Sequence, residues 1–272
     1  MQIRIFDVTH GFCAYVVADN GNVILFDCGH NEESGFRPST YLRRDGCTGI
    51  EAFVVTNYDG DHLSDLPNLR LMRRELPIDF LYLNPSINAE QLRRLKLEGG
   101  PIRLGMQALL DMMNTYTTTG AELPPFPGIE FREFWNDYPT FRDTNNLSFV
   151  TFLHYRDIHI VFPGDLEVAG WRALLRDSSF RSHLSRVNFF VASHHGRENG
   201  YCREVFEYCH PDIVIVSDGP VRYETQNTDY GRHAIGIRFG TDLRKVLTTR
   251  KDGMITIWRS PGDSNPYIDK AP

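Results

Sequence analysis

The sequence lacks the features that mark several common protein classes. Its five cysteines form an odd, scattered set without Cys-x-x-Cys spacing, so they predict neither a disulfide framework nor a thiolate zinc site. No apolar run approaches the roughly 20 residues that a membrane-spanning helix needs, and we expect no membrane partner. Residues 1–7 lack the basic, apolar and small-residue order of a signal peptide. These absences predict a protein of the reducing cytoplasm.

The chain also lacks an excess of basic charge. Lysine and arginine total 29 against 35 acidic residues, which gives a net charge of −6 and argues against a strongly basic, non-specific nucleic-acid binder. The densest basic stretch lies between Arg70 and Arg103. If it borders a cleft, it favours a nucleic acid or nucleotide as substrate. The sequence identifies no protein partner.

What is present is the pattern of a mixed α/β protein. At 272 residues, 41% of them hydrophobic, the chain is long enough for one domain over residues 1–272. A helical insert is expected at about 86–120, beginning at the capping box Asn88-Ala89-Glu90-Gln91. Apolar periodicity predicts further helices at 63–75, 167–175 and about 203–209. It predicts strands within 1–30 and at 51–56, 80–83, 131–135, 148–153, 158–162, 213–216, 245–248 and 254–258.

Three apolar strands end abruptly at side chains that bind metals. The run 53–55 leads to Asp59, Asp61 and His62, the run 160–162 leads to Asp165, and the run 189–191 leads to the pair at 194–195. Strand ends hold side chains rigidly, and carboxylates with imidazoles suit a divalent cation. The alternative is an acidic turn that caps the next helix, because Asp-Gly-Asp is also good turn chemistry.

These residues resemble the metallo-β-lactamase superfamily, and within it the ComEC-like branch. Asp7-Val8-Thr9-His10-Gly11 resembles the Asp-Val-Gly-Gln-Gly of that branch, and Leu25-Phe26-Asp27-Cys28-Gly29 its Leu-Ile-Asp-Thr-Gly. The run 57–62 takes the place of the signature His-x-His-x-Asp-His. Gly164-Asp165 resembles the bridging-aspartate motif, and Ser193-His194-His195-Gly196 the His-His-Gly motif. The resemblance implies an αββα sandwich, with two packed mixed sheets flanked by helices.

The resemblance also implies a ligand set. Asp61, His62 and one of the adjacent His194 and His195 would hold one ion, and Asp165 would bridge to a second. The second ion would need Asn57, Asp59 and Asn146. This sequence has Asn57 where the first signature histidine stands, and an amide is a weaker ligand for zinc than imidazole. We therefore expect one or two divalent ions, zinc or manganese. The candidate metal ligands are Asn57, Asp59, Asp61, His62, Asp165 and His194.

Two residues are candidates for catalysis. Asp61 is expected to orient or deprotonate the attacking water, and His195 to meet the scissile phosphate or protonate a leaving group. Residues for substrate contact or for support of the ligands are His10, Asn146, Arg197, Tyr201 and His233. Each of these five has an ordinary alternative role in loop hydrogen bonding, packing or solvation.

The predicted function is that of an intracellular metal-dependent hydrolase, a phosphodiesterase or nuclease that uses metal-activated water. One alternative keeps the fold but cleaves a non-phosphate ester, lactone or amide. Another is a non-catalytic binding protein whose metal site has degenerated at Asn57 and Asn146.

Overall fold

The first sheet contains the two ends of the described chain and the amino-terminal meander. The computed structural model describes residues 1–116, 124–219, 224–259 and 266–270. In spatial order the strands are β15 (Tyr267–Lys270), β14 (Ile255–Trp258), β1 (Gln2–Ile5), β2 (Ala14–Val17), β3 (Val23–Phe26), β4 (Ile50–Val54) and β5 (Ile78–Tyr82). Neighbours from β15 to β3 run antiparallel, whereas β3, β4 and β5 run parallel. The sheet is therefore mixed.

The second sheet is also mixed. Its strands in spatial order are β13 (Val246–Thr248), β10 (Ile213–Val216), β9 (Phe189–Val191), β8 (Ile158–Phe162), β7 (Phe149–Tyr155) and β6 (Ile129–Trp135). The pairs β6–β7 and β7–β8 are antiparallel, and β8, β9, β10 and β13 are parallel. A short hairpin of β11 (Ile237–Phe239) and β12 (Asp242–Arg244) stands apart from both sheets.

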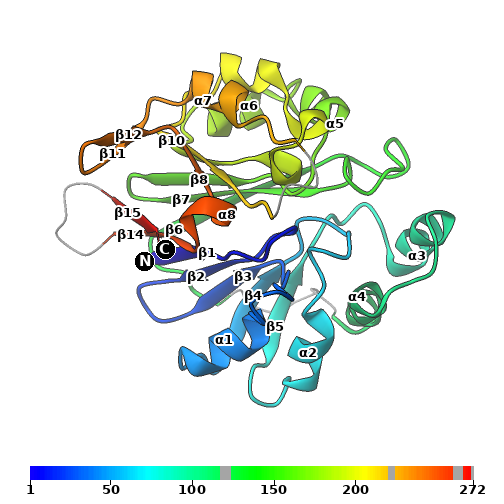
Figure 1. The fold of residues 1–272 in the computed structure, drawn as a ribbon. Helices are drawn as coiled ribbons and strands as arrows, with labels where there is room; N and C mark the ends of the chain where they lie inside the picture. The colour runs from blue at the N-terminus through cyan, green and yellow to red at the C-terminus, as the bar shows by residue number, and fades with distance from the viewer. Residues whose placement is uncertain (117–123, 220–223, 260–265, 271–272) are drawn as a thin grey trace.

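Helices cover the outer faces of the two sheets (Figure 1). On the side of the first sheet lie α1 (Pro38–Arg44), α2 (Leu66–Leu71), α3 (Ala89–Glu98) and α4 (Leu104–Thr115). Over the second sheet lie α5 (Val168–Leu174), α6 (Ser178–Leu184) and α7 (Asn227–His233), and the short α8 (Thr249–Asp252) follows β13. The predicted αββα sandwich is confirmed.

Three apolar layers hold the sandwich together. Between the sheets, Phe26 of the first sheet stacks on Phe162 of the second, with ring centroids 4.1 Å apart. A second cluster joins the first sheet to α2, α3 and α4, and a third joins the second sheet to α5, α6 and α7. Fully burying one such large apolar side chain contributes about 1.5–3 kcal/mol, so the middle layer fixes how the two sheets face each other.

The structure refines several predicted elements. Helices α3 and α4 lie in the expected insert, and α3 begins with the predicted capping box, in which Asn88 and Gln91 bond reciprocally. The predicted helix at 63–75 is shorter in the structure, and Pro67 stands in the first turn of α2, where its missing N–H costs little. The segment near 203–209 is a 3₁₀ helix, Arg203–Glu207. The helices α1, α6 and α7 were not expected from apolar periodicity. The single-domain organisation stays a prediction.

In the part of the chain that the structure describes, no helix is both long and apolar enough to cross a membrane.

Candidate metal centre

The ends of β4, β8 and β9 bring four metal-type side chains together. Asp61 and His62 lie in the loop after β4, Asp165 follows β8, and His195 follows β9. Two backbone hydrogen bonds hold this loop against the end of β3. The N–H of Cys28 donates to the carbonyl of His62, and the N–H of Asp65 donates to the carbonyl of Cys28. The parallel strands β8 and β9 end at the same edge of their sheet, which is where binding sites of open α/β sheets form.

The spacing of the donor atoms suits a single cation. His62 Nε2 lies 3.1 Å from Asp165 Oδ1. His195 Nε2 lies 3.5 Å from the same oxygen and 3.4 Å from Asp61 Oδ2. Zinc binds nitrogen and oxygen donors at about 2.0–2.2 Å, which places neighbouring donors about 3.0–3.6 Å from each other. The Nε2 atoms of His62 and His195 are buried and have no hydrogen-bond partner by geometry, although carboxylate oxygens lie 3.1–3.5 Å away. These residues fit a divalent metal.

Second partners fix the orientation of both imidazoles. The Nδ1 of His62 is 2.7 Å from Asp27 Oδ2, and Asp27 also accepts a hydrogen bond from the backbone N–H of Thr56 at 2.8 Å. The Nδ1 of His195 is 3.1 Å from the carbonyl oxygen of Ser217. When Nδ1 donates in this way, Nε2 keeps the lone pair that a metal requires. Asp27 is fully buried and supports the site rather than lining it.

In the metal-free site, His62 and His195 are positively charged. Burial by itself disfavours an imidazolium, but the carboxylates of Asp165 and Asp61 outweigh it and raise the pKa of His195 to about 9. Against the same effect of burial, Asp165 and Asp27 raise the pKa of His62 well above its usual value. The two imidazoliums in turn lower the pKa values of Asp61 and Asp165, again against burial. Without metal, the two protonated histidines together carry the same charge as a divalent ion.

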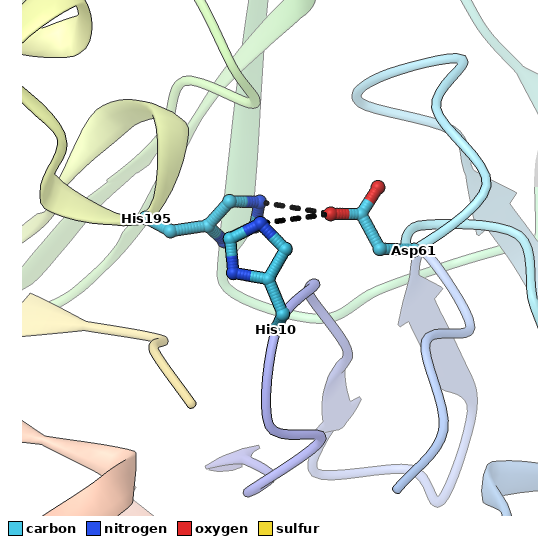
Figure 2. Close-up of side chains that lie close together, drawn as sticks. All are labelled: His10, Asp61 and His195. Carbon is cyan, nitrogen blue, oxygen red and sulfur yellow. Dashed lines mark ion pairs between the residues drawn. The ribbon is translucent and has the colours of Figure 1, made fainter. Parts of the chain in front are cut away.

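His10 joins this group from the loop between β1 and β2. Figure 2 shows its ring beside that of His195, with both rings directed at Asp61. The ring centroids of the two histidines are 4.5 Å apart, and His10 Nε2 is 3.5 Å from Asp61 Oδ2. Burial and the neighbouring positive charge of His195 lower the pKa of His10 to about 4, so this imidazole is neutral at pH 7.

Asn57 and Asp59, both predicted as metal ligands, are held by other partners. The amide nitrogen of Asn57 donates to Ser148 Oγ at 3.1 Å, and its oxygen accepts from the backbone N–H of Asp59 at 2.8 Å. The carboxylate of Asp59 pairs with Lys96 and accepts a hydrogen bond from Thr144 at 3.3 Å. Asn57 therefore shapes the turn, and Asp59 faces α3 rather than the four-residue group.

His194 and His195 point in different directions because the backbone turns sharply between them. Both have positive φ angles, 48° and 56°, a region that non-glycine residues rarely adopt. His194 Nε2 contacts Arg197 Nη1 at 3.1 Å, and its Nδ1 lies 3.6 Å from Glu167. The structure thus places His195, and not His194, with Asp61, His62 and Asp165. The guanidinium of Arg197 also contacts Nε2 of His10, so it lies between His10 and His194 at the border of the group.

The other predicted site residues belong to separate networks. The oxygen of Asn146 accepts from the backbone N–H groups of Glu167 and Gly170, at 3.2 and 2.8 Å, at the start of α5. The hydroxyl of Tyr201 is 2.8 Å from His233 Nε2, and the His233 ring stacks on Phe206. These contacts are structural, and neither network includes one of the four converging residues.

A cleft of about 620 Å³ opens beside the group and reaches Asp61. Its lining includes the acidic residues Glu32, Glu33 and Asp59, together with Arg103. Two other members of the predicted basic stretch are paired with carboxylates: Arg70 with Asp111 at 2.8 Å, and Lys96 with Asp59. The cleft is therefore mixed in charge and is not a continuous basic groove.

Sequence reasoning missed two residues that shape this region. Ser217 acts through its backbone carbonyl on His195, an interaction without a side-chain signature. Lys96 stood among the basic residues of the insert, but its pairing with Asp59 depends on how α3 packs. A lysine on the face of α3 that turns toward the loop after β4 was the available signal.

No protein-family model and no curated protein matches the sequence. Solved structures with a similar course of the chain include a diphosphatase of the PhnP family, with 11% identity and a TM-score of 0.49 over 94% of this chain and 97% of that one. A second is a Thermotoga maritima protein assigned to the metallo-β-lactamase superfamily, with 10% identity and a TM-score of 0.45 over 90% and 97%. Zinc-bound PqqB from Methylobacterium extorquens is a third, with 13% identity and a TM-score of 0.39 over 70% and 72%. These likenesses are too distant to carry a functional conclusion, which rests on the geometry of the site.

Proposed function

We propose that the protein is a metal-dependent hydrolase that cleaves phosphate esters, with a phosphodiester such as a nucleotide or nucleic acid as substrate. One observation carries the proposal. Two buried imidazole nitrogens without hydrogen-bond partners face the carboxylates of Asp61 and Asp165 at donor–donor distances that suit one cation.

The residues that would hold the ion are Asp61, His62, Asp165 and His195, in an arrangement that suits zinc or manganese. A divalent ion supplies Lewis acidity, which polarises the electrophile and lowers the pKa of water toward about 7. Once His62 and His195 each lose a proton, their Nε2 atoms could bind the ion. Their Nδ1 atoms keep a proton, which they donate to Asp27 and to the carbonyl of Ser217. The carboxylates of Asp61 and Asp165 would balance the charge of a divalent ion.

Two residues have the position to act on the substrate. Asp61 lines the cleft, where its carboxylate can orient water or accept a proton from it. Arg197 places its guanidinium at the border of the donor group, and a planar guanidinium binds phosphate oxygens in pairs. This position of Arg197 favours a phosphate ester over a neutral ester, lactone or amide.

Within the phosphodiesters, the cleft favours a short substrate. Glu32 and Glu33 line it beside Arg103, and carboxylates repel a long polyanionic backbone. A nucleotide or the end of a strand brings fewer phosphates past these carboxylates than a long strand does. Uniform cleavage within long DNA or RNA is the less favoured outcome.

Metal analysis and a substrate panel test the proposal. Protein purified without chelator should contain about one zinc or manganese per chain and should hydrolyse cyclic or linear nucleotide phosphodiesters. Arg197→Lys keeps the charge but loses the paired donors, so it should raise KM for the phosphodiester more than it lowers kcat. Cleavage of a lactone or thioester with no action on phosphodiesters would favour the alternative hydrolase. If the protein still lacked metal and activity after incubation with zinc or manganese, the alternative of a binding protein with a degenerate site would be favoured.

A further inference from the structure

We propose that His10 is a fifth donor to the ion, so that the chain holds one ion with five protein donors instead of two ions. The inference rests on the proposed function, because it concerns the same centre. In this proposal the loop between β1 and β2 supplies His10 as a donor, whereas Asn57 and Asp59 of the loop after β4 do not bind the ion.

The first argument is that two candidate donor groups share one atom. One group is His62, Asp165 and His195, and the other is His10, Asp61 and His195. Both depend on Nε2 of His195, because its Nδ1 contacts the carbonyl of Ser217. One nitrogen lone pair binds one ion. The shared nitrogen therefore excludes a separate ion in each group. The donors of the two groups do not form a single set within 4.8 Å in this structure, so one shared ion would draw the side chains inward around His195.

The second argument is that the loop carrying His10 is built against the site. A Cβ on Gly11, whose φ is 134°, would lie 2.3 Å from the carbonyl oxygen of Asp61. A Cβ on Gly219 would lie 2.8 Å from the backbone nitrogen of His10. The loop thus approaches both neighbours more closely than any side chain permits. This packing fixes His10 beside Asp61.

Ser217 couples the two histidines. Its hydroxyl donates to the carbonyl of Gly11 at 2.8 Å, and its own carbonyl lies 3.1 Å from Nδ1 of His195. One buried residue therefore contacts both the backbone next to His10 and the ring of His195. The two rings face the same oxygen of Asp61 (Figure 2). A loop histidine with an ordinary surface role would not need this support.

The third argument is the supply of donors. Asn57 and Asp59 are engaged with Ser148 and Lys96, so the loop after β4 contributes Asp61 and His62 alone to the group. His10 adds a neutral imidazole from another part of the chain. With it, the ion has three nitrogen and two oxygen donors from protein, a set that suits zinc or manganese.

Arg197 gives the inference a consequence for substrate binding. Its guanidinium contacts Nε2 of His10, and that lone pair cannot accept an N–H and bind an ion at the same time. Binding of the ion by His10 therefore moves the guanidinium off this nitrogen. Arg197 is then directed to an anionic oxygen of the substrate.

The test is metal affinity measured by chelator competition, with zinc and with cobalt(II) as a spectroscopic probe. His10→Ala should retain a stoichiometry of one but weaken binding by at least the roughly 10–100-fold that loss of an outer partner costs. Its cobalt spectrum should shift toward that of a lower coordination number, and added imidazole should reverse the shift. His30→Ala is the matched control, because His30 lines the same cleft outside both donor groups and should leave affinity and spectrum unchanged.

The outcomes separate this inference from the proposed function. A wild-type protein that binds no ion overturns both. Wild-type binding of two ions per chain, or His10→Ala with wild-type affinity and spectrum, overturns the five-donor site and leaves the proposed function intact. Loss of activity in His10→Ala with unchanged metal binding would make His10 a substrate-contacting residue and likewise overturns its role as a donor.

A double-mutant comparison tests the competition with Arg197. Arg197→Gln removes a positive charge and should strengthen metal binding in any background. It should strengthen binding more when His10 is present, because the variant also releases the lone pair of His10. An equal gain in the wild-type and His10→Ala backgrounds overturns the competition for that lone pair.

Discussion

The protein contains two groups of three histidines whose environments are opposite. His10, His62 and His195 lie at the strand ends beside Asp61 and Asp165. His154, His159 and His183 lie on β7, β8 and α6, on the outer face of the second sheet. In this outer group each nitrogen of His154 contacts a histidine, Nδ1 of His159 at 2.8 Å and Nδ1 of His183 at 3.1 Å.

The charges around the two groups account for the difference. Carboxylates raise the pKa of His195 to about 9 against the effect of burial. Burial, the charge of Arg186 and the neighbouring histidines lower the pKa of His154 to about 3. Among the described residues, the converging metal-type groups both contain His195, and the outer histidines form no such group. Proximity of three histidines is therefore not enough for a metal site. The ring nitrogens and nearby carboxylates must also be directed at one point.

Removing one carboxylate should have the largest effect. Asp165→Ala is expected to abolish metal binding and hydrolysis while the fold persists, because the lost charge faces both His62 and His195. Metal content and circular dichroism check this result. Asp59→Ala is the control, since Asp59 pairs with Lys96 and should not be needed for metal. Full metal occupancy in Asp165→Ala would contradict the site described here.

Weakening a supporting residue should have a smaller effect. Asp27→Asn keeps the size of the side chain but removes the charge that holds Nδ1 of His62. Metal affinity should fall by about 10–100-fold, as for other outer partners of metal-bound histidines. The same measurement on Asn146→Ala, whose amide supports the start of α5, should show little change in affinity. Equal losses in the two variants would mean that Asp27 acts through the fold alone.

The pH dependence of metal binding sharpens the comparison further. The pKa of His195 is about 9 in the metal-free protein, so the histidine is protonated at pH 7 and must release its proton to bind an ion. Apparent affinity should therefore rise with pH up to about 9, by about tenfold per pH unit for each proton released. Calorimetry in buffers of different ionisation enthalpy counts these protons. Metal binding without proton release between pH 6.5 and 8 would contradict the assigned charges.

The outer histidines should affect the free energy of unfolding at acidic pH, whereas the inner histidines affect metal binding at neutral to alkaline pH. The folded-state pKa of His154, about 3, lies below its unfolded value of 6.5, so acid favours the unfolded state. Stability contributed by the neutral ring is complete above pH 6.5 and falls toward pH 3, at up to about 1.4 kcal/mol per pH unit for one such group. Urea unfolding of His154→Phe should show a shallower fall than wild type. Exposed His210, changed to Gln, is the control. Identical slopes in wild type and His154→Phe would remove the special role of His154.

The sequence predicted the architecture well because strand patterns are local. The apolar runs that end at Asp59, Asp165 and His194 became β4, β8 and β9, and the capping box at Asn88 began α3. Helices α1, α6 and α7, of seven residues each, were not predicted.

The site was harder to predict, because adjacent residues in a motif do not share a direction. Asn57 and Asp59 stand in the same motif as Asp61 and His62, yet they bond to Ser148 and Lys96. The choice between His194 and His195 depends on two consecutive left-handed residues, which no side-chain pattern announces. His10 lies far from the motif in sequence, and its place beside Asp61 follows from the packing of glycine loops.

By itself, the sequence determined a strand-rich α/β protein with metal-type ligands at strand ends, because periodicity and residue chemistry are written in the order of the chain. The sandwich followed from the resemblance to a known family. Tertiary structure alone decided which of those ligands converge. That choice depends on backbone turns, on partners such as Asp27 and Ser217, and on the contact of the loop between β1 and β2 with the loop after β4. Direction and distance between segments remote in sequence arise only when the two sheets pack.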